Sequence, residues 1–172
     1  MSGNCCATIS DRLTTSGSKR LDSIDIFYQN VRGLRTKCTN FHDNVCFNDF
    51  KIMCITESWL NDSFCNRNLF PDNYLLFRAD RGYTDLNLTR GGGVLTAVHQ
   101  SLAGCKRRYD LELNSECVWI EVPLPDGFNL LVGNHYFSSN TDVKVIENYF
   151  NSLENNLNPQ NFRVVLLGPA HT

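Results

Sequence analysis

The segment FKIMCITES, residues 50–58, is a short and nearly continuous apolar run that ends in polar side chains. Such a run is typical of a strand that is covered on both faces. Upstream, residues 24–29 read as another strand that ends at Asn30, and apolar residues recur at helical spacing over 34–47. The order strand, helix, strand predicts a parallel or mixed sheet in an α/β fold.

The rest of the chain continues this pattern. Strands are predicted at 74–78, at 94–99, as a hairpin over 116–137 and at 162–167. An amphipathic helix precedes the last strand, with Thr141 predicted as its N-cap and Asp142 in its first turn. We interpret 1–22 as a disordered lead, because it is polar and lacks apolar periodicity, and 23–172 as one domain.

The amino-acid composition argues against some classes of function. Lys and Arg number 16 against 18 Asp and Glu, which gives a formal net charge of −2. This argues against a purely electrostatic nucleic-acid binder but not against an enzyme that binds phosphate through a metal. The 8 cysteines include no Cys-x-x-Cys pair, so reduced thiols in an intracellular protein are expected, with disulfides as the alternative. No signal peptide and no membrane span is predicted.

Two polar residues follow neighbouring strands of the predicted sheet. Asn30 and Glu57 each come just past a strand end, and such ends converge on the ligand crevice of an α/β sheet. A carboxylate there suits Mg²⁺, which takes few protein ligands and completes its shell with water and phosphate oxygens. The structural alternatives are a helix cap for Glu57 and an Asx turn for Asn30.

Three arginines surround a loop at 82–89 and the triple glycine that follows it. Arg78, Arg81 and Arg90 could contact a nucleic-acid backbone, or they could be exposed loop charges. The glycines at 91–93 resemble a phosphate-binding loop only weakly, because no helix follows them, and close backbone approach at a strand entry is the better interpretation.

One further side chain could reach a site at these strand ends. Tyr136 ends the return strand of the predicted hairpin, where its phenol could hydrogen-bond a scissile phosphate or remain half-buried with its hydroxyl in water. Trp119 is expected to be a core residue, and His99 and His135 are expected to be structural.

The motifs that carry a family resemblance occur in order along residues 23–168. They are QNVRGL at 29–34, ITESWL at 55–60, RADR at 78–81, GGGV at 91–94, ECVWI at 116–120, Tyr136, and VLLG at 165–168. This order resembles the endonuclease domain of non-LTR retrotransposons, within the endonuclease/exonuclease/phosphatase superfamily that includes the apurinic endonucleases.

The resemblance implies a fold and an activity. The fold would be a four-layer α/β sandwich of two mixed sheets flanked by helices. The activity would be Mg²⁺-dependent hydrolysis that nicks DNA to prime reverse transcription, in the nucleus if functional, with no small-molecule cofactor. By position, Glu57 matches the metal-binding glutamate, Asn30 the asparagine that supports the metal and phosphate site, and Tyr136 the tyrosine near the scissile phosphate.

The sequence departs from the family pattern after its last strand. Gly168-Pro169-Ala170-His171 stands where the family has Gly-Asp-Phe-Asn, and a later Ser-Asp-His motif has no counterpart. Proline offers no acceptor to the attacking water, so a truncated, catalytically defective domain with an incomplete second sheet is expected. A non-catalytic remnant that binds nucleic acid or protein is the alternative, as is a non-functional fragment of a decayed element.

Overall fold

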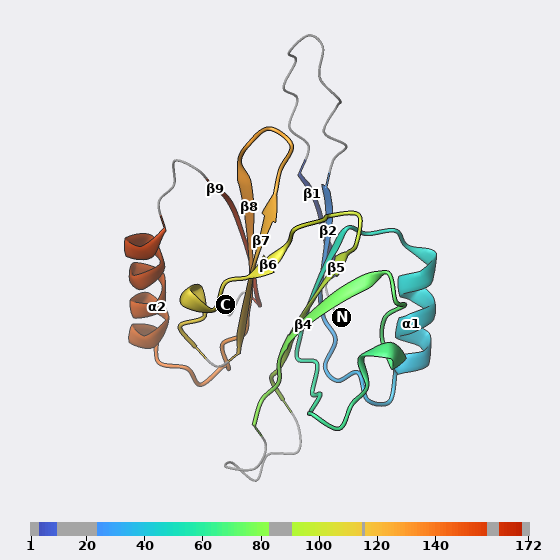
Figure 1. Ribbon diagram of the computed structural model, residues 1–172. Helices are drawn as coiled ribbons and strands as arrows, with labels where there is room; N and C mark the ends of the chain where they lie inside the picture. Colours follow the sequence, from blue (N-terminus) through green and yellow to red (C-terminus); the bar gives the residue numbers. More distant parts are fainter. Residues whose placement is uncertain (1–3, 10–23, 83–90, 115, 158–161, 170–172) are drawn as a thin grey trace.

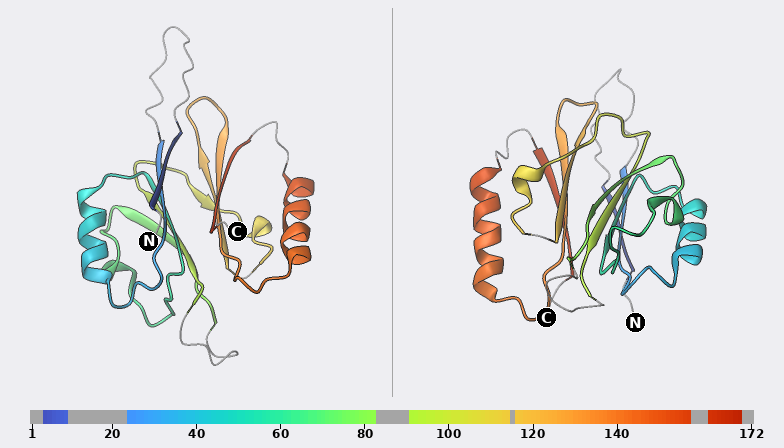
Figure 2. Two further views of the ribbon diagram at one scale, coloured as in Figure 1. Left: turned by 180° about the vertical axis from the view of Figure 1, so that it is seen from behind. Right: turned by 60° about the horizontal axis from the view of Figure 1, so that its bottom comes forward.

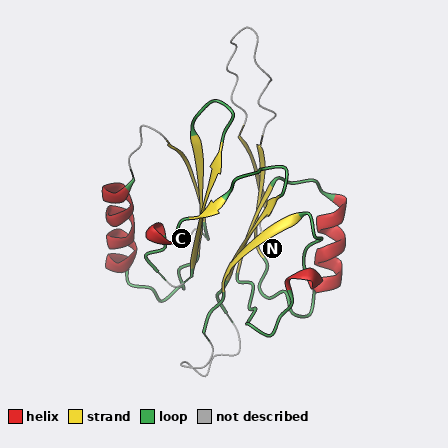
Figure 3. Cartoon of the chain, in the orientation of Figure 1, coloured by secondary structure: helices red, strands yellow, loops and turns green. Residues whose placement is uncertain are grey.

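The computed structural model describes residues 4–9, 24–82, 91–114, 116–157 and 162–169. Two β-sheets pack face to face, and one α-helix covers the outer face of each (Figure 1). The helices lie on the outside and the strands form the two inner layers (Figure 3). The view from behind shows the same separation of layers (Figure 2). The α/β class and the four-layer arrangement are therefore confirmed.

The first sheet has five strands in the order β1-β2-β3-β5-β4. Only β2 and β3 are parallel neighbours, and helix α1, Cys38–Phe47, connects them. The other pairs are antiparallel. The strands are β1 (Asn4–Ile9), β2 (Ile24–Asn30), β3 (Ile52–Thr56), β4 (Tyr74–Ala79) and β5 (Val94–His99).

The second sheet is smaller, with four strands in the order β6-β7-β8-β9. The predicted hairpin is the antiparallel pair β7–β8, and β9 joins β8 in parallel after the crossover through helix α2, Val143–Asn156. The strands are β6 (Lys106–Arg107), β7 (Cys117–Pro123), β8 (Asn129–His135) and β9 (Phe162–Leu167). Short 3₁₀ helices lie at Asn66–Asn68 and Tyr109–Leu111.

Alternation along the strands divides the apolar side chains among three cores. In β7, Val118 and Ile120 face the first sheet, whereas Cys117 and Trp119 face α2. In β3, which is buried on both faces, Ile52 and Cys54 face the second sheet while Met53 and Ile55 pack under α1. Trp119 is fully buried, so its assignment to the core is confirmed.

Helix α2 begins one residue later than its predicted cap implies. The N-cap is Asp142, whose side chain accepts a hydrogen bond from the Lys144 N–H at 2.9 Å. The prediction that the Thr141 hydroxyl caps the helix is wrong, because that hydroxyl bonds the Ser138 hydroxyl at 3.1 Å instead. Either arrangement places a carboxylate near the positive helix end.

Strand β1 corrects the expectation of a disordered lead at Asn4–Ile9. These residues pair antiparallel with β2, from Asn4 opposite Gln29 to Ile9 opposite Ile24. The pairing covers backbone groups that would otherwise form an open sheet edge. Residues 1–3 and 10–22 lie outside the described part of the chain, and the domain limits remain a prediction.

Candidate functional site

Four strands end at one edge of the sandwich. The parallel pairing of β2 and β3 places Asn30 opposite Thr56, so that Asn30 and Glu57 are neighbours. Strands β8 and β9 are also parallel to each other, and β2, β8 and β9 all run toward the lower end of the molecule in Figure 1. The sequence-based expectation that strand ends converge is therefore confirmed for these elements.

The turns after β2 and β3 are bonded to each other. The Val31 N–H donates to Thr56 O at 3.1 Å, and the Gly33 N–H donates to Glu57 O at 2.7 Å. Gly33 has a φ of 94°, and a Cβ there would lie 2.5 Å from the Trp59 ring, which explains the glycine. Glu57 itself has a φ of 54°, a conformation that costs a non-glycine residue energy and is common at functional sites.

Glu57 receives hydrogen bonds from both sheets. The Asn30 Nδ2 donates to Glu57 Oε1 at 3.0 Å, and the Tyr136 side chain, which follows β8 in the second sheet, also hydrogen-bonds Glu57. Of the ion pairs found in the described part of the chain, none involves Glu57. The structure thus brings together the three predicted site residues, and among the described residues the donors to the carboxylate are neutral.

The phenol of Tyr136 lies in a mainly negative environment. Burial raises the pKa of Tyr136 above its ordinary value, and the carboxylates of Glu57 and Glu116 raise it further, while Arg81 opposes them. Tyr136 is therefore a neutral hydrogen-bond donor at neutral pH, as a group that contacts a phosphate oxygen must be.

The residues present fit a hard divalent cation through Glu57. Within the described residues no cluster of three or more His, Cys, Asp or Glu side chains occurs, and Mg²⁺ does not require one. The Asn30 amide faces Glu57 with its nitrogen, and its oxygen accepts from the Arg32 N–H at 3.3 Å. In this arrangement Glu57 would hold the metal and Asn30 would orient Glu57.

The predicted nucleic-acid-binding arginines have internal partners. Arg78 pairs with Asp80 and also donates to Phe64 O and Asn66 Oδ1 at 2.9 and 2.7 Å. Arg81 pairs with Glu116. Their side chains are 13% and 17% exposed, so neither is an exposed loop charge. Arg90 lies outside the described residues, and nucleic-acid contact by all three remains a prediction.

The end of β9 lies beside the site. Leu167 pairs with Asn134, so Gly168 and Pro169 follow alongside His135 and Tyr136. A Cβ at Gly168 would lie 2.6 Å from His135 Nε2, which shows how closely this turn approaches the strand. Pro169 contributes no side-chain acceptor at this position.

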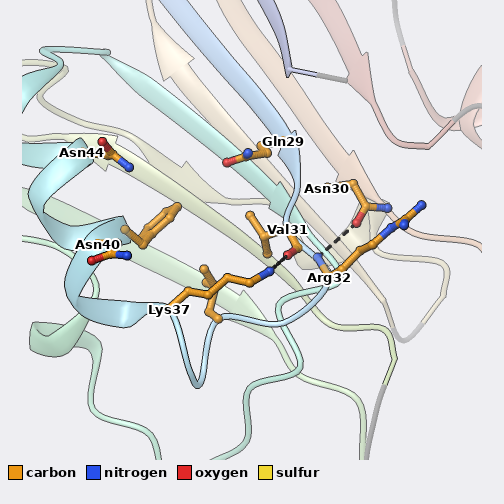
Figure 4. Close-up of a pocket in the computed structure, with 9 residues that line it drawn as sticks. Gln29, Asn30, Val31, Arg32, Lys37, Asn40 and Asn44 are labelled. Atoms are coloured by element: carbon orange, nitrogen blue, oxygen red, sulfur yellow. Dashed lines mark hydrogen bonds between the residues drawn. The ribbon is translucent and has the colours of Figure 1, made fainter. Parts of the chain in front are cut away.

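A groove of about 390 Å³ lies next to the site, between the end of β2 and α1. Gln29 points toward the helix and Asn30 away from it, as expected for neighbours on a strand (Figure 4). The Lys37 ammonium donates to Val31 O at 2.9 Å and closes one side of the groove. Its polar lining consists of Gln29, Asn30, Arg32, Lys37, Asn40 and Asn44.

Sequence reasoning missed one residue that contacts the site. Glu116 was assigned only to the start of a strand, yet its carboxylate lies between Arg81 and the triple glycine. The available signal was a charged residue at the head of the apolar ECVWI motif. Its partner is 35 residues away along the chain, a separation that local periodicity does not report.

Comparison with solved structures identifies proteins of similar fold. The endonuclease domain of TRAS1, a telomere-specific non-LTR retrotransposon, superposes with a TM-score of 0.61 at 10% identity, over 83% of this chain and 57% of that one. An AP endonuclease from Leishmania major gives 0.55 at 19% identity, over 82% and 53% of the two chains. A 3′ phosphatase from Neisseria, bound to a product DNA hairpin, gives 0.52 at 14% identity, over 83% and 56%.

These likenesses establish the fold. No protein-family model matches the sequence, and no curated protein matches it either. The chain spans a little more than half the length of the three solved structures. In the described part of the chain, no helix has the length and apolar character needed to cross a membrane.

Proposed function

We propose that this chain carries the metal-binding side of a magnesium-dependent site for phosphodiester hydrolysis in DNA, of the retrotransposon endonuclease type. One observation carries the proposal. A carboxylate with neutral hydrogen-bond donors, and with no ion pair among the described residues, sits where four strands of two sheets end. The similar folds of two endonucleases and a DNA-bound phosphatase support DNA as the substrate class.

Each residue has a part that follows from its contacts. Glu57 would hold Mg²⁺, which when bound supplies charge stabilisation at a phosphate oxygen. Asn30 donates to Glu57 and fixes the direction of its carboxylate. Tyr136 is neutral at neutral pH and can donate to a phosphate oxygen.

We further propose that turnover is defective. The residue after Gly168 follows the end of β9, which pairs with the strand that leads into Tyr136. A carboxylate there could accept a proton from water, and Pro169 has none. General-base catalysis contributes about 10²–10⁴-fold to a rate, so its loss leaves activity near background. A DNA-binding role without cleavage has less support, because Arg78 and Arg81 donate to internal acceptors.

Manganese binding tests the metal site directly, since Mn²⁺ accepts the same oxygen ligands as Mg²⁺. We expect the 172-residue protein to bind Mn²⁺ in calorimetry or electron paramagnetic resonance, and Glu57→Gln to weaken binding at least about tenfold. Glu154→Gln, on the exposed face of α2, is the matched control and should bind like the wild type. Equal binding by wild type and Glu57→Gln would refute the site.

Nicking of supercoiled plasmid tests the defect separately. We expect background nicking by the wild type, and an increase of at least about tenfold in Pro169→Asp that disappears when Glu57→Gln is added. Efficient nicking by the wild type would show that Pro169 does not limit turnover. If that nicking were lost in Glu57→Gln, the metal site itself would stand.

A further inference from the structure

A bidentate ion pair lies next to the proposed site. The guanidinium of Arg81 donates from Nε to Glu116 Oε1 at 2.9 Å and from Nη2 to Glu116 Oε2 at 2.6 Å. The two side chains are only 17% and 12% exposed. Such fork-to-fork pairs fix the geometry of both partners better than a single contact does.

The triple glycine forms the seat of this ion pair. The Gly93 N–H donates to Glu116 Oε1 at 2.7 Å. Gly92 has a φ of 67°, and a Cβ there would overlap Glu116 Oε1 and Arg81 Nε, so no other residue fits without displacing the pair. The carbonyl of Gly92 accepts from the Trp59 N–H and that of Gly93 from the Ser58 N–H, both at 3.1 Å. The glycine segment is thus hydrogen-bonded to the turn that carries Glu57.

The same pair contacts Tyr136 in two ways. The Arg81 guanidinium carbon lies 5.8 Å from the centre of the Tyr136 ring, within the range of a cation–π interaction. The Tyr136 N–H donates to the Glu116 carbonyl at 2.9 Å, which fixes the backbone of the same residue. Ring and backbone of Tyr136 are therefore both held by the Arg81–Glu116 pair.

We propose that Arg81 and Glu116, seated on Gly92 and Gly93, are positioning residues that hold the Tyr136 phenol against Glu57. The proposal rests on the proposed function, because it gives the pair its part in that same site. It also explains why the sequence needs glycine at the entry of β5 although no phosphate-binding helix follows. Arg81 acts through Tyr136 in this arrangement and is not itself a catalytic residue.

The test measures the coupling between Tyr136 and Glu57 and requires no activity. Since the Tyr136 phenol lies against the Glu57 carboxylate, Glu57→Gln should change the environment of the Tyr136 ring in the wild-type background. With 3-fluorotyrosine labelling, the change is measured as a ¹⁹F chemical shift at one fixed neutral pH, and Tyr136→Phe assigns the signal. We expect the Glu57-dependent shift to fall to less than about half in Arg81→Lys and in Glu116→Gln, as coupled residues require.

A second ion pair in the chain supplies a matched control. Arg107 donates to Glu112 through Nε and Nη2 at 2.8 and 2.9 Å, and the pair is buried to the same extent. Arg107→Lys should leave the shift unchanged. A full shift in folded Arg81→Lys protein would overturn the proposal, and so would the absence of any shift in the wild type. A reduced shift together with no Mn²⁺ binding would refute the proposed function but leave the positioning role intact.

Discussion

His135 precedes Tyr136 on the chain, and three aromatic rings surround its imidazole. The ring centres of Phe137, Tyr149 and Phe150 lie 5.2, 6.0 and 6.0 Å away. Burial lowers the pKa of His135 to about 4, because an apolar environment disfavours the charged imidazolium. This apolar environment agrees with the expectation that His135 is structural. It also makes the stability of the fold sensitive to acid.

This pKa predicts how stability depends on pH. Between pH 6.5 and 4 the unfolded chain binds a proton at His135 that the folded chain does not. The stabilisation is therefore complete above pH 6.5 and is lost as the pH falls, by on the order of 3 kcal/mol near pH 4. Urea unfolding across this range should show a shallower decline in His135→Phe than in the wild type. The control His42→Gln should retain the full decline, and equal slopes in all three proteins would contradict the prediction.

Strand β8 reaches across the interface between the sheets through one side chain. The Asn134 Nδ2 lies 3.1 Å from Ile55 O and 3.0 Å from Leu95 O, on two strands of the opposite sheet. Asn134 is fully buried. Because β8 then continues into Tyr136 and β3 into Glu57, this amide sets the relative position of the two strands close to the proposed site.

Substitutions of Asn134 should show how much its buried hydrogen bonds contribute to stability. We expect Asn134→Leu to lower the free energy of unfolding by about 2–3 kcal/mol, because buried hydrogen bonds are lost. Asn134→Asp should cost about 3–5 kcal/mol, since it places an unpaired charge among carbonyl groups. Asn129→Leu, at the other end of β8, is the control and should change the value by less than about 1 kcal/mol. If Asn134→Leu unfolded at the wild-type urea midpoint, the hydrogen bonds of Asn134 would contribute nothing to the free energy of unfolding.

Local patterns predicted the elements well and the contacts between them poorly. The alternation in 116–122 gave both faces of β7, and the apolar run at 50–56 gave a strand buried on two sides. Glu116 and Asn134 were missed because their partners lie 23 to 79 residues away. The internal partner of Arg81 was missed for the same reason, because it cannot be seen from the neighbours of Arg81 in sequence.

At the scale of the whole molecule, β9 is the outermost strand of the second sheet. Val165 and Leu167 pack between the sheets, whereas Val164 and Leu166 face outward and are 47% and 37% exposed. Apolar side chains on an edge strand favour pairing with other chains. This edge therefore predicts self-association of the protein.

Charges on this edge should reduce self-association. In sedimentation velocity we expect the wild type to form concentration-dependent oligomers, and a double variant, Val164→Lys with Leu166→Lys, to sediment mainly as a monomer. Both positions face away from the core between the sheets, so the free energy of unfolding should change by less than about 1 kcal/mol. Val145→Lys, exposed on α2, is the control and should associate like the wild type. A strictly monomeric wild type would rule the edge out.

The hydrogen bond between Glu57 and Tyr136 joins a turn of one sheet to a turn of the other. A small sliding of the two layers would break it while each sheet kept its own ladder of backbone bonds. On gradual heating, the proposed site should therefore come apart as an early, reversible event, below the temperature at which circular dichroism reports melting. Loss of the carboxylate–phenol contact would then report that the two sheets have begun to separate.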